Sequence, residues 1–252
     1  PDADLDLSGA VFSGMLAGDT LTVDGATGQF VNKMAGTGKS VSISDIRLGG
    51  ASASNYTLTA TTASATADIT AATVSVVAGI TASNKVYDGT TAATLQTGAA
   101  VFSGMVAGDT LTVASATGQF VDKMAGAGKT VSVTGITLGG ADAANYTLAD
   151  NTASTTADIS RATIGAVTGI TAAAKVYDGS TAATLTTSGA SFAGLVAGDQ
   201  ISVDSATGAF VDKNAGAGKL VAISGISLVG LDAGNYTLAS STSSTTADIT
   251  RA

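Results

Sequence analysis

The chain repeatedly alternates polar and apolar residues in short runs. Thr110-Leu111-Thr112-Val113 and Thr130-Val131-Ser132-Val133 both place an apolar side chain at every second position. A period of two is typical of a β-strand with one buried and one solvated face, and helical periodicity is nearly absent. In residues 73–162 the pattern predicts strands at about 73–78, 84–87, 92–96, 110–114, 118–123, 129–138, 144–149 and 154–160.

The same pattern returns with a period of 90 residues. Residues 73–162 align without a gap on residues 163–252, and 59 of the 90 positions are identical. Residues 1–72 align with residues 91–162, the last 72 positions of the 90-residue unit. The first copy of the unit therefore has no residues that correspond to positions 73–90. We therefore divide the chain into a truncated first repeat, 1–72, and two complete repeats, 73–162 and 163–252.

The length of the period and the density of turns predict the fold class. Ninety residues is far above the period of solenoid coils and near the size of one immunoglobulin-like sandwich. Glycine-rich segments such as Ala107-Gly108-Asp109 and Ala125-Gly126-Ala127-Gly128 are expected to be turns. We predict an all-β protein of tandem small antiparallel immunoglobulin-like sandwiches in an elongated rod, with a β-grasp-like or other small β repeat as the alternative.

Two local features refine this expectation. Asp-Gly within Lys85-Val86-Tyr87-Asp88-Gly89 favours a type I′ hairpin. Tyr87 and its counterpart Tyr177 are expected to be core or corner tyrosines whose hydroxyls bond to nearby backbone, in preference to a binding role. At the repeat boundary, residues 156–164 contain no Gly, Ser-rich or Pro linker. Strand running almost directly into strand predicts a stiff joint between repeats.

Composition excludes most catalytic chemistry. The chain has no Cys and no His, so zinc clusters, thiol nucleophiles, disulfide scaffolds and Ser-His-Asp triads lack their side chains. All nineteen acidic residues are Asp, and the net charge of −8 disfavours nucleic acid as a partner. The sequence has no run of eighteen consecutive apolar residues, so we expect no membrane insertion. We expect no enzyme activity, no catalytic, cofactor-binding or metal-binding residues, and no cofactor.

The sequence contains candidate residues for three further chemistries. Gly38-Lys39-Ser40 and Gly128-Lys129-Thr130 resemble the end of a phosphate-binding loop, but the required earlier Gly is replaced by Lys33 and Lys123, so we interpret them as hairpin loops. Calcium binding is less favoured than turn capping by the Asp residues, because the sequence has no Asp-x-Asp-x-Asp run. A lysine crosslink is also less favoured, because the sequence spacing cannot show that the reacting groups meet. The calcium candidates are Asp142 with Asn145, Asp158, Asp232 with Asn235, and Asp248; those for the crosslink are Lys85, Lys123 and Asn145.

The repeat resembles a known family. The second repeat contains, in order, Lys-Val-Tyr-Asp-Gly-Thr-Thr, Gly-Asp-Thr-Leu-Thr-Val, Phe-Val-Asp-Lys-Met-Ala-Gly-Ala-Gly-Lys, Asn-Tyr-Thr-Leu and Thr-Ala-Asp-Ile. These motifs resemble the YDG repeat, one of the mostly bacterial immunoglobulin-like repeats of large filamentous-haemagglutinin-like adhesins. The resemblance implies a stalk of a Gram-negative surface or secreted adhesin, with no catalytic residues. The unit ends, as in Arg161-Ala162, lack the Pro that is frequent in the family.

The resemblance and the composition together predict function. We expect a non-catalytic stalk or spacer of an extracellular adhesin for cell, biofilm or host attachment, whose main partners are neighbouring repeats of one long chain. The alternative is a binding module whose inter-repeat loops contact a glycan or a host protein. We expect the chain to be part of a longer protein, and we expect the truncated first repeat to lack two strands and expose an unpaired edge or apolar surface.

Overall fold

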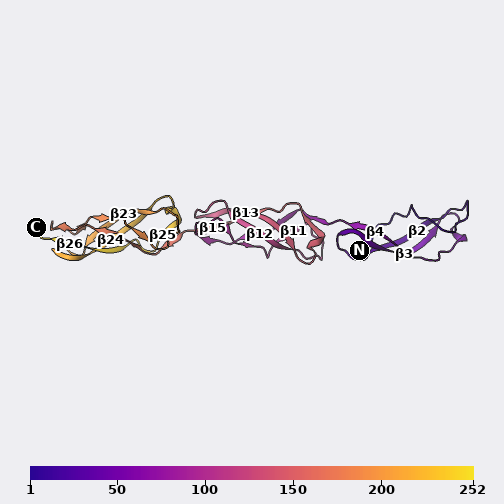
Figure 1. Ribbon diagram of the computed structural model, residues 1–252, viewed down its shortest axis with the longest axis horizontal. Helices are drawn as coiled ribbons and strands as arrows, with labels where there is room; N and C mark the ends of the chain where they lie inside the picture. The colour runs from indigo at the N-terminus through magenta and orange to yellow at the C-terminus, as the bar shows by residue number, and fades with distance from the viewer. The chain divides into compact units, whose positions relative to one another are not determined.

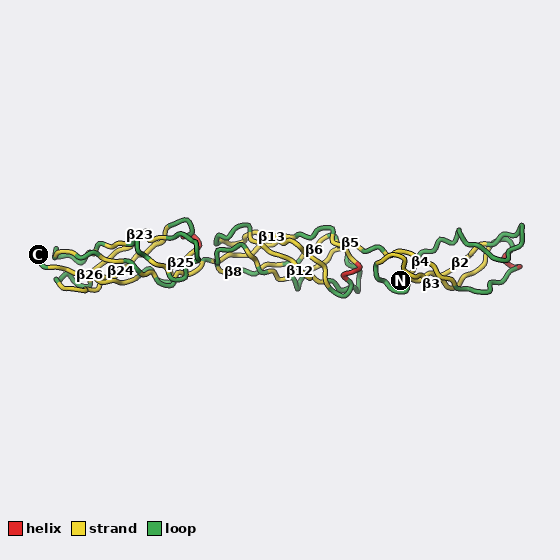
Figure 2. Tube along the Cα trace, viewed as in Figure 1, coloured by secondary structure: helices red, strands yellow, loops and turns green.

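Strands dominate the structure. The computed structural model describes residues 1–252, and its only helices are the single-turn 3-10 helices η1 (Ala53–Asn55), η2 (Ala143–Asn145) and η3 (Ala233–Asn235), which Figure 2 shows as short red turns. None of them is long enough to cross a membrane. The predicted all-β class, with many small antiparallel sheets, is confirmed.

The three repeats contain 26 strands. The first repeat has β1 (Asp2–Ala3), β2 (Thr22–Phe30), β3 (Gly36–Gly49) and β4 (Ala63–Ile69). The second has β5 (Ala72–Val74), β6 (Val76–Ala78), β7 (Thr81–Ala82), β8 (Lys85–Val86), β9 (Ala92–Ala93), β10 (Leu95–Gln96), β11 (Val101–Ser103), β12 (Thr112–Phe120), β13 (Gly126–Gly139), β14 (Tyr146–Leu148) and β15 (Ala153–Ser160). The third has β16 (Ala162–Ile164), β17 (Val167–Thr168), β18 (Thr171–Ala172), β19 (Lys175–Val176), β20 (Ala182–Ala183), β21 (Leu185–Thr186), β22 (Ser191–Phe192), β23 (Ser202–Phe210), β24 (Gly216–Val229), β25 (Tyr236–Leu238) and β26 (Ser243–Thr250).

The chain packs into two compact units whose borders cut through the second repeat. The first unit comprises residues 1–79, 100–115 and 136–151, and the second comprises residues 80–99, 116–135 and 152–252. The first unit therefore joins the first repeat to one end of the second. The second unit joins the other end of the second repeat to the third, so each boundary between repeats lies inside one unit.

Each complete repeat is built around a five-stranded sheet. In the third repeat the order is β19-β26-β24-β23-β20, and Figure 1 shows β23, β24 and β26 running side by side. The central pairs are antiparallel, but β19 joins β26 in parallel, and a separate pair, β16 with β25, is also parallel. The second repeat has the same arrangement, with β8 parallel to β15 and β5 parallel to β14. Alternation along one strand carries no information on its partner's direction, so these parallel edges were not predicted.

The predicted hairpin at Asp88-Gly89 is wrong. The flanking strands β8 and β9 lie at opposite edges of the five-stranded sheet. Gly89 has φ of 78°, but Asp88 is not among the residues with positive φ, and a type I′ turn requires both. Asp88 instead accepts hydrogen bonds from the backbone N–H and the hydroxyl of Thr90, both at 2.9 Å. This turn, closed by the Asp88 side chain, lies in the segment that crosses from β8 at one edge of the sheet to β9 at the other. Lys85 stabilises the segment by donating to Asp88 at 2.8 Å and to the Ala92 carbonyl at 3.1 Å.

Glycine marks a bulge where a turn was predicted. Residues 126–128 belong to β13, whose register against β15 shifts between Gly126 and Lys129. Gly128 has φ of 60°, a backbone conformation that residues other than glycine adopt only at an energetic cost. The phosphate-loop lookalikes therefore sit in strands rather than in hairpin loops. Their lysines bind the side chains of the preceding loop, as Lys129 does with Asp122 at 2.6 Å.

The core follows the predicted alternation. In the second unit, Val221, Ile223 and Ile249 are fully buried and face one side of their sheet. The spacing of two between Val221 and Ile223 shows that the apolar face of the strand is the buried face. A short irregularity then brings Ile226, three positions after Ile223, into the same buried cluster as Ile223.

The first repeat is incompletely covered, as predicted. Its sheet has the order β1-β2-β3-β4, which leaves β4 as an edge strand with no counterpart of β8. Phe30 is half-buried, whereas the equivalent Phe120 and Phe210 are each only 3% exposed. The number of missing strands was predicted too low, since the absent positions correspond to the four short strands β5 to β8 in the complete repeat.

Candidate functional site at the joints between repeats

The densest groups of buried polar side chains lie where one repeat meets the next. We call these contacts the first joint, between the first and second repeats, and the second joint, between the second and third repeats. The second joint lies inside the second unit and brings Tyr87 and residues 123–125 against residues 196–199 and 232–236. The first joint lies inside the first unit and uses the residues 90 positions earlier.

Asp199 is the centre of the second joint. It follows the turn at Gly198, and its side chain is 3% exposed. One carboxylate oxygen accepts the hydroxyls of Tyr87 at 2.8 Å and Tyr236 at 2.6 Å, and the other accepts the Lys123 ammonium at 3.0 Å. Two of these donors come from the second repeat and one from the third, so a single carboxylate connects the two repeats.

The electrostatics of Asp199 favour its charged form. Burial by itself raises the pKa of Asp199, but hydrogen bonds from Tyr236, Tyr87 and Lys123 outweigh burial and leave the pKa below the ordinary value. The pKa of the Lys123 ammonium is raised, first by its interaction with the Tyr87 side chain and then by its hydrogen bond to Asp199. Burial, with the hydrogen bond to Asp199, raises the pKa of Tyr236 to about 12. At neutral pH the joint thus holds a protonated lysine, a carboxylate and two neutral phenols.

Asn235 makes the second polar contact of this joint. Its side chain is fully buried, and its carbonyl oxygen accepts the backbone N–H of Ala125 at 2.9 Å. The amide nitrogen reaches the sulfur of Met124 at 3.6 Å. The helix η3 positions the residue, because the backbone N–H of Asn235 donates to the Asp232 carbonyl at 2.9 Å. A loop of the second repeat is thereby fixed to the third repeat by its backbone, which a side-chain ion pair alone would not achieve.

Apolar contacts complete the second joint. The rings of Tyr87 and Tyr236 meet edge to face, with centroids 5.5 Å apart and an interplanar angle of 77°. One continuous cluster of buried residues runs from Phe120 in the second repeat to Ile223 in the third. A methyl group added to Gly89 would stand 2.9 Å from Val196, so this glycine permits the close approach as well as the turn.

The first joint repeats this arrangement with one part absent. Asp109 accepts the hydroxyl of Tyr146 at 2.7 Å and pairs with Lys33, which also pairs with Asp142 at 2.6 Å. Asn145 accepts the backbone N–H of Ala35 at 2.9 Å, as Asn235 does in the second joint. No counterpart of Tyr87 is present, because the chain holds no first-repeat copy of that position.

The sequence candidates have structural partners. Asp142, Asn145, Asp232 and Asn235, considered above as calcium ligands, are joint residues. Asp158 and Asp248 accept the backbone N–H of the bulge glycines Gly128 and Gly218 at 2.7 Å. In residues 1–252, no group of three acidic side chains gathers where it would hold a metal ion.

Sequence reasoning overlooked the central carboxylates. Asp109 was named only as part of a predicted turn and Asp199 was not singled out, although Ala-Gly-Asp recurs in all three repeats. Tyr87 is buried, as predicted, but its hydroxyl donates to Asp199 of the next repeat and not to nearby backbone. Tyr177 is 39% exposed, so the prediction of a core position is wrong for Tyr177. The difference arises because Tyr87 is covered by residues of the following repeat rather than by its own.

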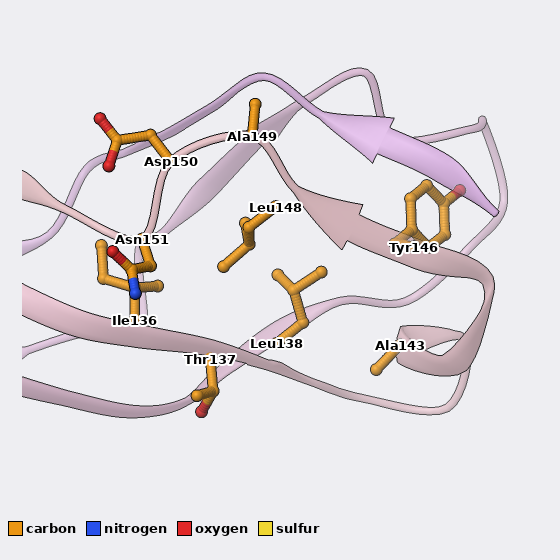
Figure 3. A pocket seen from close by; sticks show the side chains of 9 residues that line it. All are labelled: Ile136, Thr137, Leu138, Ala143, Tyr146, Leu148, Ala149, Asp150 and Asn151. Atoms are coloured by element: carbon orange, nitrogen blue, oxygen red, sulfur yellow. The ribbon is translucent and has the colours of Figure 1, made fainter.

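A groove of about 570 Å³ lies beside the first joint, along β13 and β14. Figure 3 shows Leu138 and Leu148 pointing toward one another between their strands, with Thr137 and Asp150 directed outward. The hydroxyl of Tyr146, which also lines the groove, already donates to Asp109 and accepts from the Val106 N–H at 2.9 Å. The groove is therefore walled by leucines and edged by small polar groups.

The second joint is expected to loosen in acid. The lowered pKa of Asp199 means that its carboxylate stabilises the joint above the ordinary value of 3.8, and that this stabilisation is lost as the pH falls through the folded pKa. Asp109 and Asp142 at the first joint share the direction, through Lys33. We expect the protection of the Ala125 amide against hydrogen exchange, measured relative to its intrinsic rate at each pH, to fall below about pH 4. An Asp199→Asn variant should lose this acid dependence, and an unchanged exchange profile in that variant would contradict the assignment.

The comparisons with known proteins agree with the repeat structure. A family model described as the YDG domain matches three times, at residues 2–64, 70–155 and 161–245. No curated protein and no solved structure matches the chain. Each match contains one copy of the Ala-Gly-Asp turn and one of the Asn-Tyr-Thr-Leu segment on which the joints are built. Since the three matches span most of the sequence, the chain belongs to the YDG domain family.

Proposed function

We propose that these repeats are a non-catalytic, load-bearing stalk of a bacterial surface or secreted adhesin of the filamentous-haemagglutinin-like type. The observation that carries the proposal is the construction of the joints. Only Arg161 separates β15 from β16, and the buried groups around Asp199 and Asn235 bind consecutive repeats to each other. A protein that transmits force between its ends needs such joints, whereas a flexible tether does not.

The chemistry of the joint fits repeated use along a chain. Each complete repeat carries both sets of residues that meet at a joint. One end has the tyrosine and the loop in which a lysine is followed by methionine or asparagine. The other end has the Asp, Asn and Tyr that this loop contacts. The same contacts recur 90 residues apart, as in Ala35 with Asn145 and Ala125 with Asn235. Identical repeats can thus be added in series without a new interface, which is how a spacer of adjustable length is built. The location outside the cell is part of this proposal and rests on the family resemblance.

Residual dipolar couplings test the rigid joint. We expect the amides of the second and third repeats to share one alignment tensor, because the joint fixes their orientation. Two distinct tensors would contradict a load-bearing joint. The variant Asp199→Ala, which removes the central acceptor, should separate the tensors while each repeat keeps its strand pairings, and serves as the positive control for a loosened joint.

The groove between β13 and β14 supports a second candidate, a binding module for a glycan or host protein. Its volume of about 570 Å³ is in the range of small-ligand sites, and its lining includes Tyr146, whose hydroxyl donates to Asp109 of the first joint. A glycan array and a cell-binding assay with the whole chain decide between the two functions. Saturable binding that is abolished by Leu138→Asp but not by the equivalent change at Leu228 would favour the binding module over the stalk.

A further inference from the structure

A methionine sulfur lies at each joint. In the second joint, the Sδ of Met124 accepts a hydrogen bond from the side-chain nitrogen of Asn235 at 3.6 Å. In the first joint, the Sδ of Met34 accepts from the side-chain nitrogen of Asn145 at 3.8 Å. The contact is thus made twice, 90 residues apart, and each time with the asparagine that fixes the loop of the preceding repeat.

The asparagine of the second joint depends on this sulfur. The Asn235 side chain is 1% exposed, and its carbonyl oxygen already accepts the Ala125 N–H at 2.9 Å. Its amide nitrogen donates to the Met124 sulfur and to no oxygen atom of the protein. A thioether is a weak acceptor, but here it is the group that keeps a buried amide from being unpaired.

The residue that carries this sulfur is exposed, although the asparagine beside it is buried. Met124 is 38% exposed. One sulfur lone pair faces the amide of Asn235, so a reagent that comes from solvent meets the other lone pair. Met15 and Met105 are slightly more exposed, but their sulfurs accept no hydrogen bond. A reagent that attacks exposed methionines therefore reaches all three, and of these only Met124 contacts an asparagine of a joint.

The relevant reaction is the oxidation of a thioether by hydrogen peroxide. A sulfur lone pair attacks one oxygen of the peroxide, an S–O bond forms and the O–O bond breaks. The second oxygen leaves as water and takes the proton of the transferred oxygen. Sulfur loses two electrons and the peroxide gains them. The sulfur of the resulting sulfoxide is the positive end of the S–O dipole, so it is no longer an acceptor for an amide N–H, and the new oxygen points to the solvent side.

We propose that Met124 is an oxidation site through which a peroxide loosens the second joint. Sulfoxide formation leaves the Asn235 amide unpaired in a buried place, and this cost is relieved when the asparagine turns outward and releases the Ala125 N–H. Met34 gives the first joint the same property. The chemistry rests on the contacts of the joint, whereas its consequence, a stalk that becomes flexible under oxidant, rests on the function proposed above.

Hydrogen peroxide treatment of the whole chain tests the site, with peptide mapping by mass spectrometry to identify each methionine that has gained an oxygen. We expect the protection of the Ala125 amide against hydrogen exchange to fall about tenfold or more once Met124 is oxidised, because a buried hydrogen bond is lost. Reduction of the sulfoxide by methionine sulfoxide reductases should restore the protection.

The third repeat supplies the matched control. It holds Asn214 at the position of Met124, so Met124→Asn is a natural residue for this loop. An asparagine offers its carbonyl oxygen to Asn235 in place of the sulfur and is not oxidised by peroxide. The Ala125 amide of this variant should therefore keep its protection in peroxide, while Met15 and Met105 still gain oxygen.

Unchanged or increased protection of the Ala125 amide after full oxidation of Met124 would overturn the proposal. An equal loss in peroxide-treated Met124→Asn would also overturn it, because another methionine would then be responsible. If Met124→Asn loosens the joint by itself, the oxidised and re-reduced forms of the unaltered chain still decide. Alignment tensors separate this result from the proposed function: two tensors before oxidation count against the stalk, whereas one tensor both before and after oxidation counts against the oxidation site alone.

Discussion

Tyr87→Ala is expected to lower the free energy of unfolding of the second joint by about 3 to 4 kcal/mol. The side chain is 3% exposed, its ring packs edge to face on Tyr236, and its hydroxyl donates to Asp199 at 2.8 Å. Truncation exposes no new partner for the buried ring's neighbours: it removes the buried ring area and leaves a cavity that the surrounding side chains cannot fill. It also removes one hydrogen-bond donor from a buried carboxylate. Chemical denaturation followed by circular dichroism, with native-state hydrogen exchange of the Ala125 amide, measures the loss.

The chain supplies a matched control for this change. Tyr177 stands at the equivalent position of the third repeat but is 39% exposed, and Tyr177→Ala should cost about 1 kcal/mol or less. Tyr87→Phe, which keeps the ring and removes only the hydroxyl, should cost about 1 to 2 kcal/mol. Equal losses for Tyr87→Ala and Tyr177→Ala would show that the ring is stabilised by its own repeat and not by the joint.

The period and the strand content could be read from the sequence because each repeat carries the signal. Alternation within Thr130-Val131-Ser132-Val133 identified a strand, and the recurrence at 90 residues fixed the boundaries of homologous units. The alternation is a local pattern, and the repeats can be aligned with one another directly in the sequence. The distribution of buried side chains along β13, where Val131 and Val133 are fully buried, follows directly from them.

Strand partners and joint partners could not be read in the same way. Asp88-Gly89 has the composition of a hairpin turn, but the parallel pairing of β8 with β15 involves residues about 75 positions apart, and that pairing determines the course of the chain. The Asn235 side chain meets the Ala125 backbone 110 positions away. Each of these residues also fits a turn or a cap within its own repeat, so a local pattern cannot show that its partner belongs to the neighbouring one. The aligned positions reveal the joint only once the fold places the ends of consecutive repeats together.

Asp199→Ala is expected to open the second joint and to lower its free energy of unfolding by about 3 kcal/mol. The change leaves the hydroxyls of Tyr87 and Tyr236 without their acceptor in a buried place and removes the nearer carboxylate of Lys123. The Lys123 ammonium stays 3.5 Å from Asp232 and its side chain is 39% exposed, so solvent and Asp232 offset part of the loss.

The equivalent carboxylate of the first repeat provides the control. Asp19 accepts the hydroxyls of Tyr56 at 2.5 Å and Ser52 at 3.1 Å, but it meets no lysine and no tyrosine of a preceding repeat. Asp19→Ala should therefore cost about 1 kcal/mol and leave both joints intact. Phe210, Val221 and Ile249 of the third repeat form a buried cluster of their own, apart from the one that contains Tyr87 and Tyr236, so Asp199→Ala should separate the alignment tensors of the two repeats while this cluster of the third repeat stays folded.

A double-mutant cycle between Tyr87→Ala and Asp199→Ala then isolates their interaction. If the two side chains stabilise the joint through the same hydrogen bond, the double variant loses less than the sum of the single losses, by about 1 to 2 kcal/mol. Strict additivity would show that each side chain acts through other partners, and that the carboxylate does not connect the repeats through this tyrosine. Because Tyr87 belongs to the second repeat and Asp199 to the third, this coupling measures how much their pairwise contact contributes to the attachment of one repeat to the next.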